Sequence, residues 1–252
     1  MHIFHKKHSK NYDLRPSNIK NVNYIIIHYT EMHFDNAVSR LCDPNAKVSA
    51  HYIIKKTGEI YQLVGDFYRA WHCGQSQWKN ESDINNSSIG IELDNLGNEE
   101  FTKEQINSLL DLLKLLQSKY NVLPKNILGH SDIAPSRKID PGIFFDWQIL
   151  RQHGFGIAFP RSDTKNLQKI SLTKDKILDI QKKLKNIGYR ISISGDLDKQ
   201  TSDVIRAFQL HFNKVAIMEQ GGYDFLTNPE NIYEWYDQSD IILNNIVETQ
   251  NK

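Results

Sequence analysis

The residues best suited to chemistry lie in Gly129–Gly142, which reads GHSDIAPSRKIDPG. Within fourteen residues this segment offers an imidazole (His130), an ammonium (Lys138) and a carboxylate (Asp140). Its two prolines fix their own φ angles and bias the preceding residues away from helix, which predicts a stiff, non-helical loop. Histidine together with aspartate suits a borderline metal such as zinc. A catalytic zinc site usually has three protein ligands, so another part of the chain has to supply one more.

The third ligand is expected at the end of a strand. Asn23–Thr30 (NYIIIHYT) is a continuous β-branched and aromatic run, which predicts a strand buried on both faces. His28 lies near its end, where a buried sheet opens to a cleft, although a hydrogen-bonded core histidine is the alternative role. Neighbouring strands run about 4.8 Å apart, so strand ends can bring His28, His130 and Asp140 to one ion. Two other histidines in range of the same cleft compete as ligands: His51 and His72.

A second carboxylate, Glu92, lies within Ser88–Asp94 (SIGIELD), another predicted strand. Successive side chains of a strand point to opposite faces, so its two isoleucines and Leu93 share one face and Glu92 points to the other. Gly90 precedes Glu92 on that second face and leaves room for a ligand. We therefore expect Glu92 to line a cavity rather than to point into solvent.

The other segments of residues 22–160 predict the elements around these strands. Their expected positions are a helix at Asp35–Cys42, a hairpin at Ser49–Ile54 and Ile60–Val64, a helix at Thr102–Tyr120, a strand at Ile127–Leu128 and a short helix at Asp146–Arg151. Phe67–Ser88 is a long polar loop with embedded aromatic residues, which is typical of a binding surface. The patterns predict an α/β domain with a mixed central β-sheet flanked by helices.

The two ends of the chain predict different structures. Residues 1–21 are polar and basic without periodicity, which predicts a mobile arm. Residues 161–173 are polar and unpatterned, which predicts a linker. Residues 174–247 predict a small all-α domain with its own core, built from amphipathic helices at Lys174–Ile187 and Gln200–Phe212 and further helix within 229–247.

Composition limits the classes of protein that fit the chain. Its 252 residues suffice for one large domain, or for a medium domain and a small one. The 31 basic and 30 acidic residues leave a net charge of +1, which favours neither nucleic acid nor an anionic membrane as a partner. No apolar run approaches the roughly eighteen residues of a membrane helix, and the first residues are not a recognisable signal peptide. Cys42 and Cys73 are either two small buried apolar residues or a disulfide, and the sequence leaves both open.

Five segments of the chain occur in a characteristic order: NYIIIHYT, VSAHYIIKKTGEIYQLV, AWHCG, SIGIELDN and GHSDIAPSRKIDPG. In that order they resemble the zinc-dependent N-acetylmuramoyl-L-alanine amidases of the type 2 amidase family, which also contains the peptidoglycan recognition proteins. The resemblance covers about Asn23–Leu150. The C-terminal segment DIQKKLKNIGYRISISGDLDKQTSDVIRAFQLHF resembles the three-helix peptidoglycan-binding domain that is often joined to such amidases. Both resemblances point to the same polymer.

The resemblance implies a role for the candidate residues. It makes His28, His130 and Asp140 the ligands of one zinc ion (Zn2+). It makes Glu92 the catalytic carboxylate and Lys138 its partner near the scissile carbonyl, which agrees with general-base and oxyanion chemistry. The further residues that we expect in the substrate groove are Tyr29, His51, Tyr52, Trp71, His72 and Asn86.

The expected reaction is hydrolysis of the amide between the lactyl group of N-acetylmuramic acid and L-alanine of the stem peptide. Peptidoglycan or muropeptides are the expected partners. One alternative is a recognition protein that holds muropeptides without cleaving them, which the presence of all three ligands and Glu92 disfavours. Another is a different metallohydrolase with the same ligands, such as a carboxypeptidase. The wall-binding domain favours the bacterial cell envelope and the periplasm, whereas the missing export signal favours a cytosolic role on small fragments.

Overall fold

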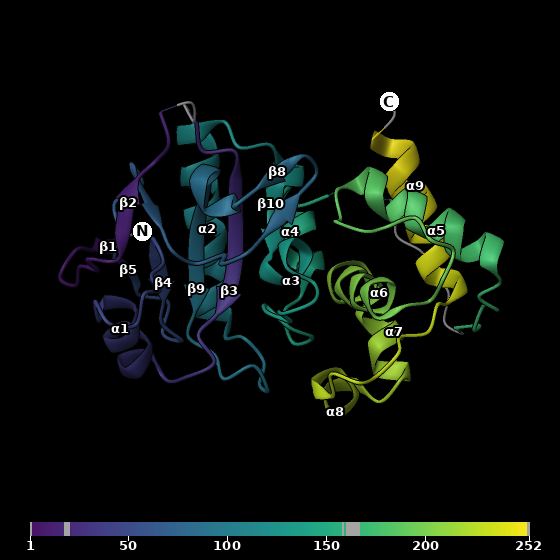
Figure 1. Ribbon diagram of the computed structural model, residues 1–252. Coiled ribbons are helices and arrows are strands. Elements are labelled where there is room, and N and C mark those ends of the chain that lie inside the picture. The colour runs from purple at the N-terminus through teal and green to yellow at the C-terminus, as the bar shows by residue number, and fades with distance from the viewer. Residues whose placement is uncertain (1, 18–20, 158, 160–166, 251–252) are drawn as a thin grey trace.

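The computed structural model describes residues 2–17, 21–157, 159 and 167–250. It contains a sheet-based unit followed by a group of helices, and the two lie side by side (Figure 1). This is the predicted fold class, a mixed central sheet with flanking helices and a helical C-terminal region.

Six strands build the central sheet in the order β1-β5-β4-β9-β3-β10. Their bounds are β1 (Ile3–Phe4), β3 (Tyr24–Tyr29), β4 (Tyr52–Ile54), β5 (Ile60–Gln62), β9 (Ser88–Leu93) and β10 (Ile127–Gly129). β4 and β5 pair antiparallel, and all other neighbours in this sheet pair parallel. The register of β3 and β9 sets His28 directly beside Glu92.

The rest of the sheet-based unit consists of short strands and helices. Two small antiparallel pairs are β2 (Tyr12–Leu14) with β6 (Tyr68–Ala70) and β7 (Gln77–Trp78) with β8 (Glu81–Ser82). The helices are α1 (Phe34–Cys42), α2 (Lys103–Tyr120), α3 (His130–Ile133) and α4 (Trp147–Gln152), with 3-10 turns η1 (Ile84–Ser87) and η2 (Pro124–Asn126). Thr102 caps α2, because its hydroxyl accepts a hydrogen bond from the backbone N–H of Gln105 at 3.1 Å.

Strand β3 divides its side chains between two cores, as expected of a strand buried on both faces. Ile25 and Ile27 are fully buried in a cluster with the apolar side of α2. Tyr24 and Ile26 belong to a second cluster on the opposite face. His28 continues the even-numbered series, so it points to that second face.

The N-terminal segment differs from the predicted mobile arm. β1 adds a parallel strand at the edge of the central sheet, and β2 pairs with β6. Ser9 and Asn11 lie buried, and the Asn11 side chain donates to the backbone oxygens of Asp43 and Val48, both at 2.8 Å. Sequence periodicity could not show this because the strands span only two and three residues.

The helical region also differs from the prediction, because it has no separate core. Its helices are α5 (Lys174–Ile187), α6 (Lys199–Phe212), α7 (Lys214–Glu219), α8 (Gly222–Thr227) and α9 (Asp237–Gln250). Leu184 and Phe208 of these helices belong to the same buried cluster as Ile26 and Leu128 of the sheet. Part of the predicted linker, residues 161–166, lies outside the described residues, whereas Ile170 is tied to the helices by a backbone hydrogen bond to Trp235 at 2.9 Å.

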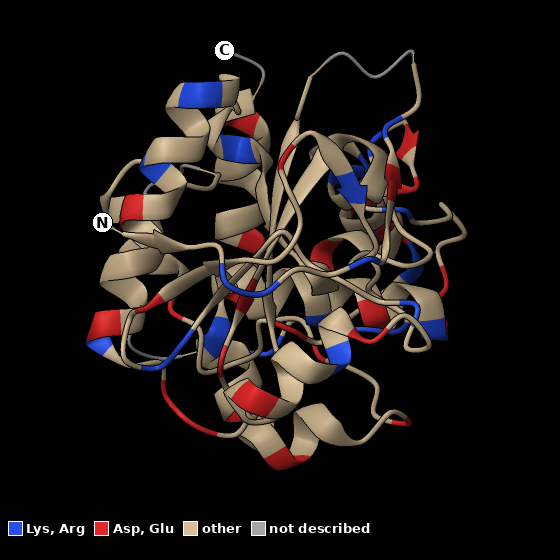
Figure 2. Ribbon diagram, turned by 90° about the vertical axis from the view of Figure 1, so that its left-hand side faces the viewer, with Lys and Arg blue, Asp and Glu red and all other residues tan. Residues whose placement is uncertain are grey.

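The state of the cysteines, the surface charge and the hydropathy of the helices bear on the remaining predictions. Cys42 and Cys73 are both free thiols, which excludes the disulfide alternative. Lys and Arg residues are interspersed with Asp and Glu in the view of Figure 2, in line with the net charge of +1. Among the described residues, no helix has the length and apolar character that crossing a membrane requires.

Candidate active site

Three ligating atoms from distant parts of the chain meet at one point. The Nδ1 atoms of His28 and His130 are 3.0 Å apart, and Asp140 Oδ2 lies 3.0 Å from the first and 3.1 Å from the second. All three side chains are buried. Donor atoms that share a tetrahedral ion at about 2.0–2.2 Å lie about 3.3–3.5 Å from one another. The cluster could therefore hold a metal ion with little rearrangement.

Adjacent parallel strands deliver the two imidazoles. His28 lies at the end of β3, and His130 follows β10, which pairs with β3 in parallel register. The predicted non-helical loop begins instead with the single helical turn α3, which ends at Ala134, the residue that Pro135 restricts. Asp140 returns to this turn, where its backbone oxygen accepts from the Ser131 N–H at 2.9 Å.

The protonation states favour a cation between these groups. His130 Nε2 lies 3.0 Å from the backbone oxygen of Cys73, which only accepts, so Nε2 donates to it and Nδ1 is the ring nitrogen that faces Asp140. Burial and the neighbouring charge of His130 lower the pKa of His28 to about 4. Burial would raise the pKa of Asp140, but the charge and hydrogen bonds of the two histidines outweigh it and hold that pKa well below its usual range. All three residues present a potential ligand atom to one point, an arrangement that suits a bound cation.

Glu92 and Lys138 lie at the edge of this cluster. Glu92 is partly buried beside His28, and its Oε2 atom has no hydrogen-bond partner among the described residues. Burial, followed by the charge of Asp140, raises the pKa of Glu92 well above its usual range, and the ammonium of Lys138 acts in the opposite direction. Lys138 is half-buried and lines the same cavity as Glu92.

The cluster opens into a cavity of about 610 Å³ to which both parts of the chain contribute. On the sheet side it is lined by the three ligating residues, Glu92, Lys138 and neighbours that include Met32 and Arg40. On the helical side its lining residues are Arg206, Leu226, Thr227 and Pro229. Sequence reasoning missed these residues of the helical region, because no motif marks them and only tertiary packing brings them to the site.

The residues that we expected in the substrate groove fall into two groups. Tyr29, Trp71 and His72 line the cavity. His72 is also an inner neighbour of the cluster, since its Nδ1 lies 3.0 Å from Nε2 of His28.

The other three expected groove residues have their polar atoms engaged away from the cavity lining. His51 is fully buried; its Nδ1 accepts from the Gly90 N–H at 3.0 Å and its Nε2 lies 3.0 Å from the oxygen of Tyr68. The Tyr52 hydroxyl donates to Asp66 at 2.6 Å. The Asn86 side chain accepts from Arg69 Nε at 2.7 Å. These contacts hold the walls of the site together.

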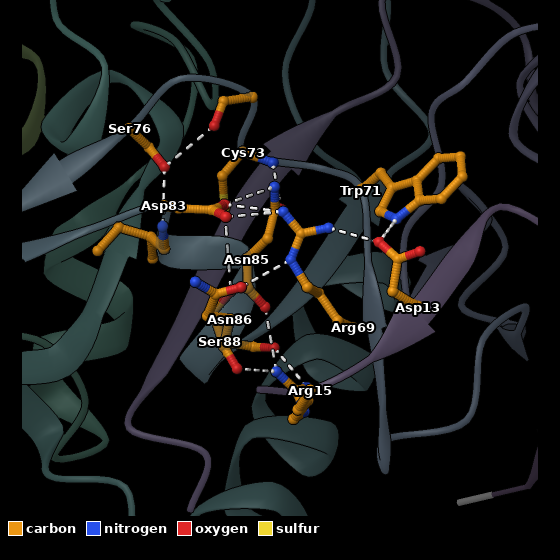
Figure 3. A network of polar contacts seen from close by, with 12 residues as sticks. Asp13, Arg15, Arg69, Trp71, Cys73, Ser76, Asp83, Asn85, Asn86 and Ser88 are labelled. Carbon is orange, nitrogen blue, oxygen red and sulfur yellow. Dashed lines mark hydrogen bonds and ion pairs between the residues drawn. The ribbon is translucent and has the colours of Figure 1, made fainter. Parts of the chain in front are cut away.

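A polar network braces the loop that carries Trp71, His72 and Cys73 (Figure 3). The Asn85 side-chain oxygen accepts from the backbone N–H groups of His72 and Cys73 at 3.0 and 2.8 Å. Trp71 Nε1 donates to Asp13 of strand β2 at 2.7 Å. The network therefore fixes the Cys73 carbonyl group that orients His130.

Arg15 anchors the N-terminal segment to the same network (Figure 3). Its guanidinium donates to the backbone oxygens of Asn85, Asn86 and Ser88 at 3.1, 2.8 and 2.8 Å. Burial lowers the pKa of Arg15 to about 10, and the carboxylate of Asp66 partly offsets that effect. The sequence pattern gave no sign of this role, because a single arginine in a polar segment is usually exposed.

Side chains of the helical region form hydrogen bonds with the turn that carries His130. The Asp132 side chain in α3 is fully buried and accepts from the Tyr189 hydroxyl and from His211 Nδ1, both at 2.7 Å, and from the Gly129 N–H at 2.8 Å. Arg206 donates to the backbone oxygen of Pro135 in the loop that follows. The side of the cleft that holds His130 is thus fixed from both parts of the chain.

The geometry describes a buried two-histidine, one-aspartate cluster at strand ends, beside an unpaired glutamate and an open cavity. Residues 18–143 match the family described as N-acetylmuramoyl-L-alanine amidase, and residues 173–215 match the peptidoglycan binding domain family. The chain therefore belongs to the N-acetylmuramoyl-L-alanine amidase family, a family of amide hydrolases.

Individual relatives support that assignment over nearly the whole chain. The chain is 32% identical to the N-acetylmuramoyl-L-alanine amidase AmiD of Escherichia coli over 235 residues, 86% of this chain and 84% of that protein. The structure of AmiD from E. coli in complex with anhydro-N-acetylmuramic acid-L-Ala-D-gamma-Glu-L-Lys matches with a TM-score of 0.73 and 28% identity, covering 94% of this chain and 93% of the other. The 1,6-anhydro-N-acetylmuramyl-L-alanine amidase AmpD of Haemophilus influenzae is 35% identical over 159 residues, 56% of this chain and 86% of that protein.

Proposed function

We propose that the protein is a zinc-dependent amidase that cleaves the bond between the lactyl group of N-acetylmuramic acid and L-alanine in peptidoglycan or muropeptides. The observation that carries the proposal is the convergence of His28, His130 and Asp140 beside Glu92, at the base of an open cavity. Membership of the amidase family supports the same reaction.

In this proposal the three clustered residues hold one zinc ion. When bound, zinc supplies a Lewis acid for the amide carbonyl and lowers the pKa of a bound water toward about 7. The contact of His130 Nε2 with Cys73, and that of His28 Nε2 with His72 at 3.0 Å, keep the ring orientations that ligation requires.

Glu92 is suited to the proton transfers of amide hydrolysis. An amide is a poor electrophile with a poor leaving group, so attack by water needs a base, and departure of the amine needs an acid. Burial of Glu92 raises its pKa, which makes the carboxylate a stronger base, and the unpaired Oε2 atom is free to take the proton. Glu92 then returns that proton to the nitrogen of the departing L-alanine.

Lys138 is suited to stabilise the charge that develops on the scissile carbonyl. It lines the cavity two residues before Asp140, and the described part of the chain gives its ammonium no ion-pair partner. An ammonium group directed at the oxyanion lowers the barrier most where water is excluded. Tyr29 and Trp71 are proposed to contact the sugar or peptide in the same cavity.

The substrate is proposed to be wall polymer or large fragments of it. AmiD, to which this chain is similar, was solved with an anhydro-muropeptide, and the helical region matches a peptidoglycan-binding family. A protein that both cleaves and binds the wall would act in the bacterial cell envelope, and we propose the periplasm as its location.

The test is mass spectrometry of purified muropeptides after incubation with the zinc-loaded protein, with and without a chelator. We expect release of the intact stem peptide with a free L-alanine amino group, complete loss of release after chelation, and recovery when zinc is added back. Glu92→Gln should retain zinc by metal analysis while losing turnover. Binding of muropeptides without cleavage would support the recognition protein instead, and release of the C-terminal amino acid would support a carboxypeptidase.

A further inference from the structure

A polar groove between the two parts of the chain is not used by the chemistry described above. One section of about 160 Å³ lies between Gln75–Gln77, the turn at Ser136 and Arg137, and the helical region. Ser136 and Arg137 also line the metal cavity, so the groove adjoins that cavity across a single turn. A second section continues past Gln75 along the loop before β9.

The groove carries positive charge that the protein does not neutralise. Arg190 lines both sections, is exposed, and makes no hydrogen bond or ion pair with any part of the described chain. Among the described residues, Arg137 donates only to the backbone oxygens of Cys73 and Gln75, at 3.0 and 2.5 Å, and has no carboxylate partner there. Asp203 lines the first section and Asp83 the second, and both are already paired, Asp203 with Lys199 and Arg206 and Asp83 with Arg69.

Amides and hydroxyls make up the rest of the polar lining of the first section, beside the apolar Ile133, Ala134 and Pro135. Gln75, Gln77 and Gln200 contribute carboxamides, and Ser76 and Ser136 contribute hydroxyl groups. Two guanidinium groups in such a setting suit a carboxylate, because guanidinium binds carboxylates through short, charge-assisted hydrogen bonds. Carboxamides suit the amides of an adjoining peptide.

We propose that this groove is a second binding subsite, which takes a free carboxylate of a peptidoglycan stem peptide next to the cavity. The proposal rests on the proposed amidase function and adds to it a place for wall polymer beyond the scissile bond. A γ-linked glutamate leaves its α-carboxylate free, and each uncrosslinked stem ends in another carboxylate. Arg190 acts here as a binding residue, not a catalytic one.

The experiment measures sedimentation with insoluble sacculi in the Glu92→Gln background, which prevents cleavage during the assay. Adding R190E should weaken binding about fivefold or more, the size expected for replacing one partly exposed ion pair by a repulsion. The matched control is K185E, which makes the same change of charge at an exposed lysine that lines none of these cavities. Thermal unfolding should be the same for both variants, because Arg190 forms no hydrogen bond or ion pair within the described part of the chain.

Two further arms identify the ligand. Converting the carboxylates of the sacculi to amides should abolish the difference between R190E and its parent. Free L-Ala-γ-D-Glu-L-Lys should compete for binding, and versions amidated at the glutamate or at the C-terminus distinguish the two carboxylate sources. An equal loss in R190E and K185E, or a loss that persists on amidated sacculi, would overturn the subsite. Failure of the wild-type protein to cleave a small muropeptide would instead refute the amidase function, and the two failures are distinguishable.

Discussion

Replacing Tyr189 with phenylalanine tests whether the helical region stabilises the turn that holds His130. The substitution removes the hydroxyl group that donates to Asp132 at 2.7 Å, where Tyr189 is 2% exposed and Asp132 is not exposed at all. The aromatic ring stays, together with its edge contact to Trp78 at 4.9 Å between centroids, so buried apolar area hardly changes. The change in stability therefore reports the loss of one buried hydrogen bond to a carboxylate.

A hydrogen bond to a charged group contributes about 1.5–3 kcal/mol, so we expect the free energy of unfolding to fall by about 2 kcal/mol. Asp132 keeps two donors, Gly129 N–H and His211 Nδ1, which prevents a larger loss. Because one buried cluster spans the sheet and the helices, the whole chain should still unfold in a single transition.

The assay is urea unfolding followed by tryptophan fluorescence and by circular dichroism. Trp78 of the sheet-based unit and Trp235 of the helical region are both buried, so the signal reports on both parts. The matched control is Tyr236→Phe, which removes a hydroxyl that donates to the partly exposed Glu234 at 3.2 Å and should cost no more than about 0.5 kcal/mol. Equal losses in both variants, or two separate unfolding transitions in the wild-type protein, would refute the coupling.

The remaining predictions concern the site, the helical region and pH. Glu92→Gln should reduce kcat by about 10²–10⁴-fold without loss of zinc, measured by amidase assay and metal analysis; unchanged kcat would remove Glu92 from the mechanism. His28→Ala should lose zinc as well, shown by the same metal analysis. Ending the chain at residue 157 should give aggregated protein in size-exclusion chromatography, because Ile26 and Leu128 would lose their apolar cover. Burial, followed by the charge of Arg15, lowers the pKa of His51 from 6.5 to about 4. Between pH 6.5 and pH 4 the His51 side chain therefore binds a proton in the unfolded chain but not in the folded protein. His51 should therefore account for about 3 kcal/mol of the stability that the protein loses as the pH falls from about 6.5 to 4, measured in urea unfolding as the difference between the wild-type protein and His51→Gln; the same pH dependence in both would count against a buried neutral His51.

The sequence was most informative where local patterns decide the structure. The alternation in SIGIELD correctly assigned Ile89, Ile91 and Leu93 to one core and Glu92 to the opposite face. The apolar run NYIIIHYT correctly predicted a strand buried on both faces. Both results follow from the two-residue period of strands, which needs no knowledge of distant contacts.

The sequence was least informative where one distant contact decides the role of a side chain. Tyr52 begins β4, the strand next to β9, and His51 directly precedes it; both are expected in the groove from the sequence. His51 instead bonds Gly90 and Tyr68, and Tyr52 bonds Asp66. Arg15 shows the reverse case, since an arginine in a polar segment becomes the anchor of a buried network. Such partners arise from the register of the folded chain and leave no periodic signal.

The two cores on either side of β3 explain why the helical region borders the candidate active site. Ile25 and Ile27 of β3 pack toward α2, whereas Tyr24 and Ile26 pack in the cluster that includes the helices. His28 follows on the second face, so the cluster of ligating residues forms where the apolar cover from the helices ends and the cavity begins. The same helices then supply one wall of that cavity through Arg206 and Leu226. Core stability and one wall of the cavity thus depend on the same helices to which we assign wall binding, and a substitution there has to be measured for all three.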